Sequence, residues 1–342
     1  MNTLRPLLVG ALLPILAAVL ISALLLVAFG VDPFDYYGVV VHRGLLTPRG
    51  LQDTIIRMAP LMLIAASLIV SFRAGLWNLG TDGQYLLAAV VVAASCPLLD
   101  AALGHVPALL IGCVLALATG ALWAVLPAML RAWQGVNEII TTLMMSFLGT
   151  ALANALVKLA LRDPAATVPQ TRTLPVADRL PRLFGTTVGL GVPIALVVLI
   201  AVHLATTHTA WGLRLRTLGA NPRAARHAGI DVPRTTVMAL VLSGAIAGLA
   251  GGIDIVGVWG NVRADWNPAY GLSVIPLVFL ARLNGWAVIG FVLLFSMLSV
   301  GAESASIHVG VPSYFSFVLV ALILLFLALA EWLGQRRQWA GT

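Results

Sequence analysis

Apolar stretches long enough to cross a bilayer recur along almost the whole chain, and the first runs from Leu7 to Phe29. A stretch of roughly 18 or more apolar residues is typical of a transmembrane α-helix. Inside lipid the backbone polar groups must be paired, and a helix pairs them within the segment. Charged residues make up only 10% of the chain, whereas soluble domains carry about 25%. The sequence therefore predicts an all-α, polytopic bundle of transmembrane helices.

We expect about ten spans in one transmembrane domain, residues 1–342. The expected spans are 7–29, 54–72, 84–99, 106–130, 139–160, 190–206, 236–258, 270–282, 286–301 and 314–332. The eighth and ninth spans are separated only by the four residues from Arg282 to Gly285. They therefore form either a tight hairpin or a re-entrant pair.

The distribution of basic residues predicts the orientation. If the termini lie inside, the inner segments hold eleven basic residues and the outer segments seven. Cytoplasmic segments of membrane proteins carry the excess of Lys and Arg. This predicts cytoplasmic termini, a cytoplasmic loop at 207–235 and an external, irregular loop at 162–189, whose prolines oppose a long helix. The same rule explains the net charge of +7 without nucleic acid as a partner.

The most polar part of the chain is 206–235, which carries five arginines and one acid, Asp231. Within it, Asn221 is a favourable N-cap, Pro222 suits the first helical position and Gly229 is a natural stop. The intervening helix, about seven residues or roughly 10 Å long, is too short to cross a bilayer. It must lie at the surface between two spans, where a soluble partner can reach it.

The sequence contains no nucleotide-binding or catalytic motif. A GxxxxGK[ST] loop needs a lysine followed by Ser or Thr, but the only lysine, Lys158, precedes Leu159. The six histidines and two cysteines show no metal-ligand spacing, and there is no GxSxG motif. We therefore expect a chain that is not an enzyme, with no metal site and no cofactor.

Two polar interruptions separate apolar runs. The first, 72–84, is either an ordinary turn between spans or irregular backbone that lines a solute path. Its polar side chains are Asn78, Asp82 and Gln84. In the second, 135–142, Asn137 is expected to cap a helix, and Glu138 favours the positive helix end. Contact with a ligand is the alternative role for these two residues.

A later apolar run combines small residues with an acid. Gly244, Gly248 and Gly252 recur at four-residue spacing, a pattern that allows helices to approach closely in lipid. We expect them to serve packing within the chain rather than dimerisation. Asp254 follows near the outer end of the same helix. It is either a functional intramembrane acid or a plain interfacial one.

Four motifs occur in series along the chain. They are GLWNLGTDGQYLLAA at 75–89, GVNEIITTLM at 135–144, GLRLRTLGANPRAARHAGIDVPR at 212–234 with the small-residue helix after it, and NPAYG at 267–271. In this order they resemble the permease subunits of ABC importers for nucleosides and simple sugars. The resemblance extends from about residue 50 to 330. Trp77 stands where the group usually has Phe, and Asp82 and Asp254 stand where it has Glu. The wider family includes branched-chain amino-acid and ribose permeases.

The resemblance implies a transport unit in a bacterial inner membrane. Its parts would be two permeases, the second expected to be a different chain, with two ATPase subunits and an external binding protein or lipoprotein. The helix 221–229 would dock on the ATPase. The coupling residues are then Arg216, Gly219, Asn221, Pro222, Arg223, Ala224, Ala225, Arg226 and Gly229. The candidates for the solute path are Asn78, Asp82, Gln84, Asn137, Glu138, Asp254 and Asn267.

Two other functions remain open at this point. The first is a secondary transporter driven by H⁺ or Na⁺, which buried mid-helix acids paired with bases would favour. The second is a structural membrane subunit without transport activity. Dependence of uptake on ATP, and co-purification with an ATPase, distinguish the three.

Overall fold

The computed structural model describes residues 13–183 and 185–311, with separate residues between 315 and 330. Within these residues the regular elements are helices, and β-structure is limited to two isolated bridges. The predicted all-α class is confirmed for this part of the chain. The chain divides into two compact units, Ile56–Gly290 and a second formed by Met1–Ile55 with Phe291–Thr342.

The unit of the two chain ends contains α2 (Leu13–Ala28), α3 (Pro33–Val41) and most of α13 (Gly285–Val309). The sequence analysis did not predict α3, which begins where the Asp32 carboxylate accepts a hydrogen bond from the Phe34 amide. α13 approaches α3 at Gly301, where an added Cβ would lie 2.3 Å from the Val40 carbonyl oxygen.

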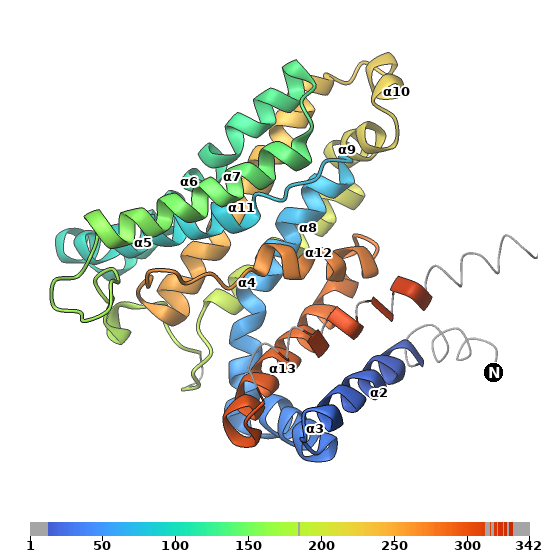
Figure 1. Cartoon of the computed structure of the whole chain (residues 1–342). Helices are drawn as coiled ribbons and strands as arrows, with labels where there is room; N and C mark the ends of the chain where they lie inside the picture. Colours follow the sequence, from blue (N-terminus) through green and yellow to red (C-terminus); the bar gives the residue numbers. More distant parts are fainter. Residues whose placement is uncertain are drawn as a thin grey trace, which may run out of the picture. The chain divides into compact units, whose positions relative to one another are not determined.

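The unit Ile56–Gly290 holds the remaining helices (Figure 1). They are α4 (Pro48–Arg73, whose first turns belong to the other unit), α5 (Thr81–Leu103), α6 (His105–Gln134), α7 (Glu138–Ala155), α8 (Gly191–His208), α9 (Ala210–Ala220), α10 (Pro222–His227), α11 (Val232–Asp254) and α12 (Tyr270–Leu280). In Figure 1, α5, α6, α7 and α11 run side by side. The short helix α10 lies beyond α9, at one end of this unit.

Seven helices in the described part of the chain are long and apolar enough to cross a membrane. They correspond to seven of the ten expected spans. The expected span 270–282 needs correction, because α12 has only 11 residues and is about 16 Å long. It is followed at once by left-handed backbone at Arg282 and Leu283. The expected spans 7–29 and 314–332 lie partly outside the described residues, so the count of ten stays a prediction.

The helices α6 and α11 pack closely through glycine. An added Cβ at Gly120 would lie 2.1 Å from the Gly244 carbonyl oxygen and 2.8 Å from the Gly248 Cα. Small residues at this spacing are typical of helices in contact within lipid. The prediction that the glycines of α11 serve packing within the chain is confirmed.

The segment 162–189 is irregular in its described residues, as predicted, but it is well connected. It contains a single 3₁₀ turn, Val176–Asp178. Its backbone follows the chain after α11, with Leu180 N donating to Val256 O (2.9 Å) and Thr171 N donating to Val262 O (3.0 Å). The loop is therefore fastened beside the end of α11.

Candidate functional site

The buried side-chain amide of Asn78 fixes the position of the non-helical residues 74–80, which connect α4 to α5. Asn78 is fully buried, and its Nδ2 donates to Gln84 Oε1 (3.1 Å) and to Ser243 Oγ (2.9 Å). Its Oδ1 accepts a hydrogen bond from the Gly80 amide (3.1 Å). Buried polar groups of this kind stabilise a fold when they are fully paired. Asn78 and Gln84 thus tie this break in the helices, called break 74–80 below, to α5 and α11.

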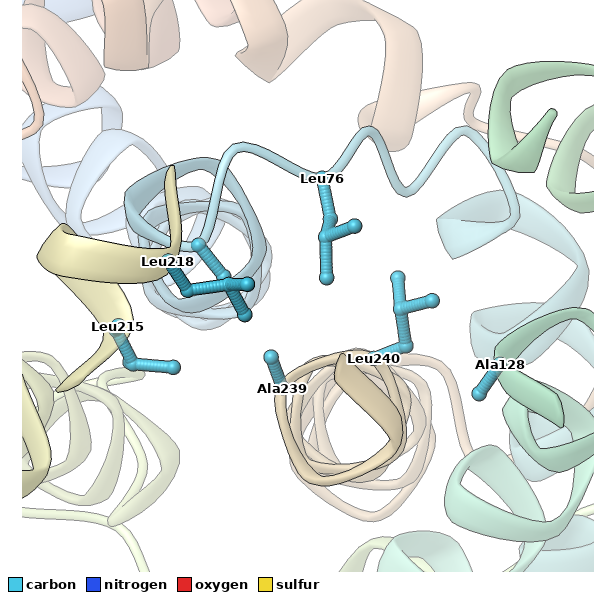
Figure 2. Packing of buried hydrophobic residues seen from close by; sticks show 7 residues of the cluster. Leu76, Ala128, Leu215, Leu218, Ala239 and Leu240 are labelled. Atoms are coloured by element: carbon cyan, nitrogen blue, oxygen red, sulfur yellow. The ribbon is translucent and has the colours of Figure 1, made fainter. Parts of the chain in front are cut away.

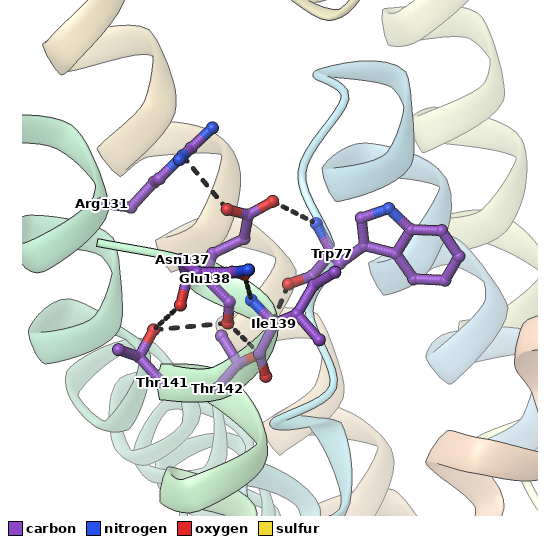
Figure 3. Close-up of polar contacts among 7 residues, drawn as sticks. All are labelled: Trp77, Arg131, Asn137, Glu138, Ile139, Thr141 and Thr142. Atoms are coloured by element: carbon purple, nitrogen blue, oxygen red, sulfur yellow. Dashed lines mark hydrogen bonds and ion pairs between the residues drawn. The ribbon is translucent and has the colours of Figure 1, made fainter. Parts of the chain in front are cut away.

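Side chains in the first turns of α7 also bond to break 74–80 (Figure 3). Glu138 is 6% exposed, and its Oε2 lies 3.1 Å from Nε of Arg131. Its other carboxylate oxygen accepts the Trp77 amide at 3.5 Å. One turn later, Thr142 Oγ1 accepts the Leu79 amide at 3.1 Å. The Glu138 carboxylate therefore connects the end of α6 with break 74–80.

Two buried acids lie close to one tyrosine. Asp82, in the first turn of α5, accepts a hydrogen bond from the Gly271 amide (2.7 Å) and so caps α12 from another helix. Its negative charge suits the positive end of α12. Asp254, at the end of α11, is 3% exposed and accepts a short hydrogen bond from the Tyr85 hydroxyl. Asp82 lies three residues before Tyr85 on α5, a spacing at which two side chains are neighbours on one helix face.

Aromatic rings surround this tyrosine. The Tyr85 ring centroid lies 6.0 Å from that of Trp266 and 5.8 Å from that of Tyr270. Trp266 in turn contacts Trp259, with centroids 5.7 Å apart, and Trp259 is 41% exposed. Sequence reasoning did not single out these four rings. The available signal was the position of Tyr85 and Tyr270 inside two of the motifs, beside the acids.

Asn137 and Asn267 are exposed and bond to nearby backbone. Asn137 Oδ1 accepts the Ile139 amide at 2.9 Å, so the predicted N-cap of α7 is confirmed. Asn267 Oδ1 accepts the Ala269 amide at 2.8 Å, in the loop before α12. Both side chains therefore shape local backbone.

The predicted surface helix is present as α10. Asn221 Oδ1 accepts the amides of Arg223 (2.9 Å) and Ala224 (3.2 Å), and Pro222 is the first helical residue. Gly229 has φ +77°, the left-handed conformation expected of a residue that ends a helix. The side chains differ in their exposure. Arg223, Ala224 and Arg226 are exposed, whereas Ala225 is fully buried.

The helix α9, which the sequence analysis did not predict, joins α10 to break 74–80. Its last turn approaches the break at Gly219, where an added Cβ would lie 2.6 Å from Arg73 O and 2.8 Å from Gly75 N. A cluster of buried side chains includes residues of α9 and of break 74–80 (Figure 2). It comprises Ala74, Leu76, Ala128, Leu215, Leu218, Ala239 and Leu240. On the exposed face of α9, Arg216 donates to the Thr207 carbonyl at 3.3 Å and so binds α9 to the end of α8.

Comparison with known proteins agrees with this architecture. Residues 50–327 match the family described as branched-chain amino acid transport system / permease component. The glucose ABC transporter permease protein TsgB13 of Haloferax volcanii is 33% identical, over 95% of this chain and 88% of its own length.

Two nucleoside permeases are also similar. The nucleoside ABC transporter permease protein NupB of Lactococcus lactis is 30% identical, over 93% of this chain and 90% of its own length. The guanosine ABC transporter permease protein NupP of Bacillus subtilis is 30% identical, over 81% of this chain and 80% of its own length. The chain therefore belongs to the branched-chain amino acid transport system / permease component family, and it is a permease subunit of an ABC transporter.

Proposed function

We propose that this chain is one permease of an ATP-driven importer in a bacterial inner membrane. Its termini and the segment 207–235 face the cytoplasm, and the loop 162–189 faces outward. A partner ATPase hydrolyses ATP. A second permease of different sequence and an external binding protein or lipoprotein complete the transporter. The positive bias of the inner segments supports this orientation, and the family supports the partners.

The solute that we propose is a nucleoside or a related sugar-bearing molecule. The named functions of the similar permeases support it, since they include nucleoside, guanosine and glucose transport. The chemistry around Tyr85 also fits. Aromatic rings stack on bases and on the apolar faces of sugars, and carboxylates accept hydrogen bonds from hydroxyl groups. Branched-chain amino acids and ribose are the alternative solutes within the family.

The observation that carries the proposal is a continuous connection from the surface helix α10, through α9 and break 74–80, to Asp82 on α5. The ordered helix α10 continues from α9, whose Gly219 lies against Gly75 at the level of the backbone. Break 74–80 leads directly into α5, which carries Asp82 and Tyr85. Because glycine pairs of this kind leave no side chain to absorb movement, a displacement of α9 is transmitted to the start of α5. We infer that this is how the ATPase stroke reaches the solute path.

Among the expected path residues, we propose different roles. Asp82 and Asp254 shape the path beside Tyr85. Asn78, Gln84 and Glu138 hold break 74–80 through the contacts described above. Asn137 and Asn267 maintain local backbone at the ends of α7 and α12.

Asp254→Asn is expected to lower the initial rate of nucleoside uptake roughly 10- to 100-fold, because hydrogen bonds to charged groups contribute about 1.5–3 kcal/mol. The matched control is Asp265→Asn. Asp265 is an acid further along the chain than Asp254, but it is 70% exposed in its pair with Lys158, and an exposed pair contributes little. Its left-handed backbone tolerates Asn. Equal uptake rates in the two variants, at equal amounts of assembled transporter, would argue against a path at Asp254.

The driving force is tested with the assembled transporter in proteoliposomes. We expect uptake of radiolabelled nucleoside to require internal ATP and the binding protein, and to persist when an uncoupler removes the proton gradient. Uptake that stops with the uncoupler while ATP is constant would instead support ion coupling, for which the buried Asp82 and Asp254 are suitable groups.

A further inference from the structure

Three side chains of types that can ligate a metal lie close together, and none of them is among the residues proposed for the solute path. They are Asp100 near the end of α5, His105 at the start of α6, and Asp178 at the end of the 3₁₀ turn in the loop 162–189. One ligand atom from each lies within 4.8 Å of the other two, and all three residues are half-buried. The sequence spacing gave no sign of this group, because its third member comes from a distant loop.

The histidine nitrogen in this group lacks a hydrogen bond. His105 Nδ1 is itself buried and has no hydrogen-bond partner, since the nearest carboxylate oxygen, Oδ1 of Asp100, is 3.8 Å away. In residues 13–183 and 185–311, no Lys or Arg side chain pairs with the carboxylates of Asp100 or Asp178. A buried nitrogen without a partner is unfavourable, and so are two carboxylates that face each other without a cation.

We propose that Asp100, His105 and Asp178 bind a divalent transition-metal ion, with Zn²⁺ or Mn²⁺ as the preferred class. One imidazole nitrogen and two carboxylates favour these ions over Ca²⁺ and Mg²⁺, which prefer oxygen ligands alone. Water would complete the coordination, because the three side chains are only half-buried. The proposal is independent of which solute the transporter carries.

A bound metal ion would restrain the loop 162–189. Asp178 belongs to the segment whose next residues bond to the chain after α11, where Leu180 N donates to Val256 O at 2.9 Å. Val256 lies two residues after Asp254. A metal ion at this site would therefore join the α5–α6 turn to the loop that lies beside Asp254.

The test uses the full-length chain, purified without a metal-binding tag and stripped with a chelator. Titration calorimetry with Zn²⁺ alone, and then with Mn²⁺ alone, should show one saturable site per chain. His105→Ala and Asp178→Asn should each weaken binding more than about tenfold, since each removes a ligand. His227→Ala on α10, which is exposed, and Asp163→Asn in the same loop, which is half-buried like Asp178, are the matched controls and should bind as the unmodified chain does.

A second measurement separates binding from folding. Zn²⁺ should slow tryptic cleavage at the exposed Arg172 in the unmodified chain but not in Asp178→Asn, and without metal this variant should melt at no lower temperature than the unmodified chain. The proposal fails if neither ion binds, or if the His105 and Asp178 variants bind as the controls do.

Discussion

Gly248→Ala is expected to lower the free energy of unfolding of the detergent-solubilised chain by about 1–3 kcal/mol, the usual effect of overpacking. The added Cβ would lie 2.3 Å from the Ala116 carbonyl oxygen and 2.9 Å from the Gly120 Cα. Both obstacles are backbone atoms of α6, so no side-chain rotation relieves them. The two helices must separate, and their contact contributes to the centre of the unit Ile56–Gly290.

Gly290→Ala is the matched control for this change. It adds the same methyl group within α13, another long apolar helix, and nothing lies within 4 Å of the new Cβ. The greater helix propensity of Ala predicts no loss of stability there, and a gain of up to about 1 kcal/mol. Thermal unfolding in detergent, followed by tryptophan fluorescence, measures both variants. Equal melting temperatures would contradict the close packing of α6 and α11.

Ala224→Trp is expected to abolish ATP-driven uptake while the chain remains folded and inserted in the membrane. Ala224 is exposed on α10, so an indole there changes the surface that we propose docks on the ATPase without entering the chain's own core. A bulky side chain in a fitted contact typically costs about 1–3 kcal/mol or more. Co-purification with the ATPase, nucleoside uptake and stimulation of ATP hydrolysis should therefore fall together.

The structure changes which substitution is informative at this helix. From the sequence, Ala224 and Ala225 are equivalent probes. Ala225 is fully buried, so Ala225→Trp would damage the chain's own packing and cannot separate docking from folding. The control is Val168→Trp, at a residue 57% exposed in the loop 162–189, which should leave uptake unchanged. An Ala224→Trp variant that transports at the normal rate with its ATPase bound would show that α10 is not the coupling element.

Local sequence was sufficient to predict the features that depend only on residues close together in the chain. The caps at Asn137 and Asn221 were predictable, because an N-cap side chain bonds to amides only two or three residues away. The ending of α10 at Gly229 follows from the freedom of glycine to adopt positive φ. The long apolar helices were predictable for a similar reason, since lipid requires each segment to pair its own backbone groups.

The sequence by itself thus determined an all-helical membrane chain, its capped surface helix and its family motifs. The tertiary structure decided which polar residues meet. Asp82 caps α12 through Gly271, Tyr85 bonds to Asp254, and Gly219 lies on the chain before α5. Each of these contacts joins segments that are far apart along the chain. Whether a buried acid caps a helix, faces a solute or pairs with a tyrosine depends on which helices pack together, and that is set by side-chain volume and glycine contacts across the whole unit.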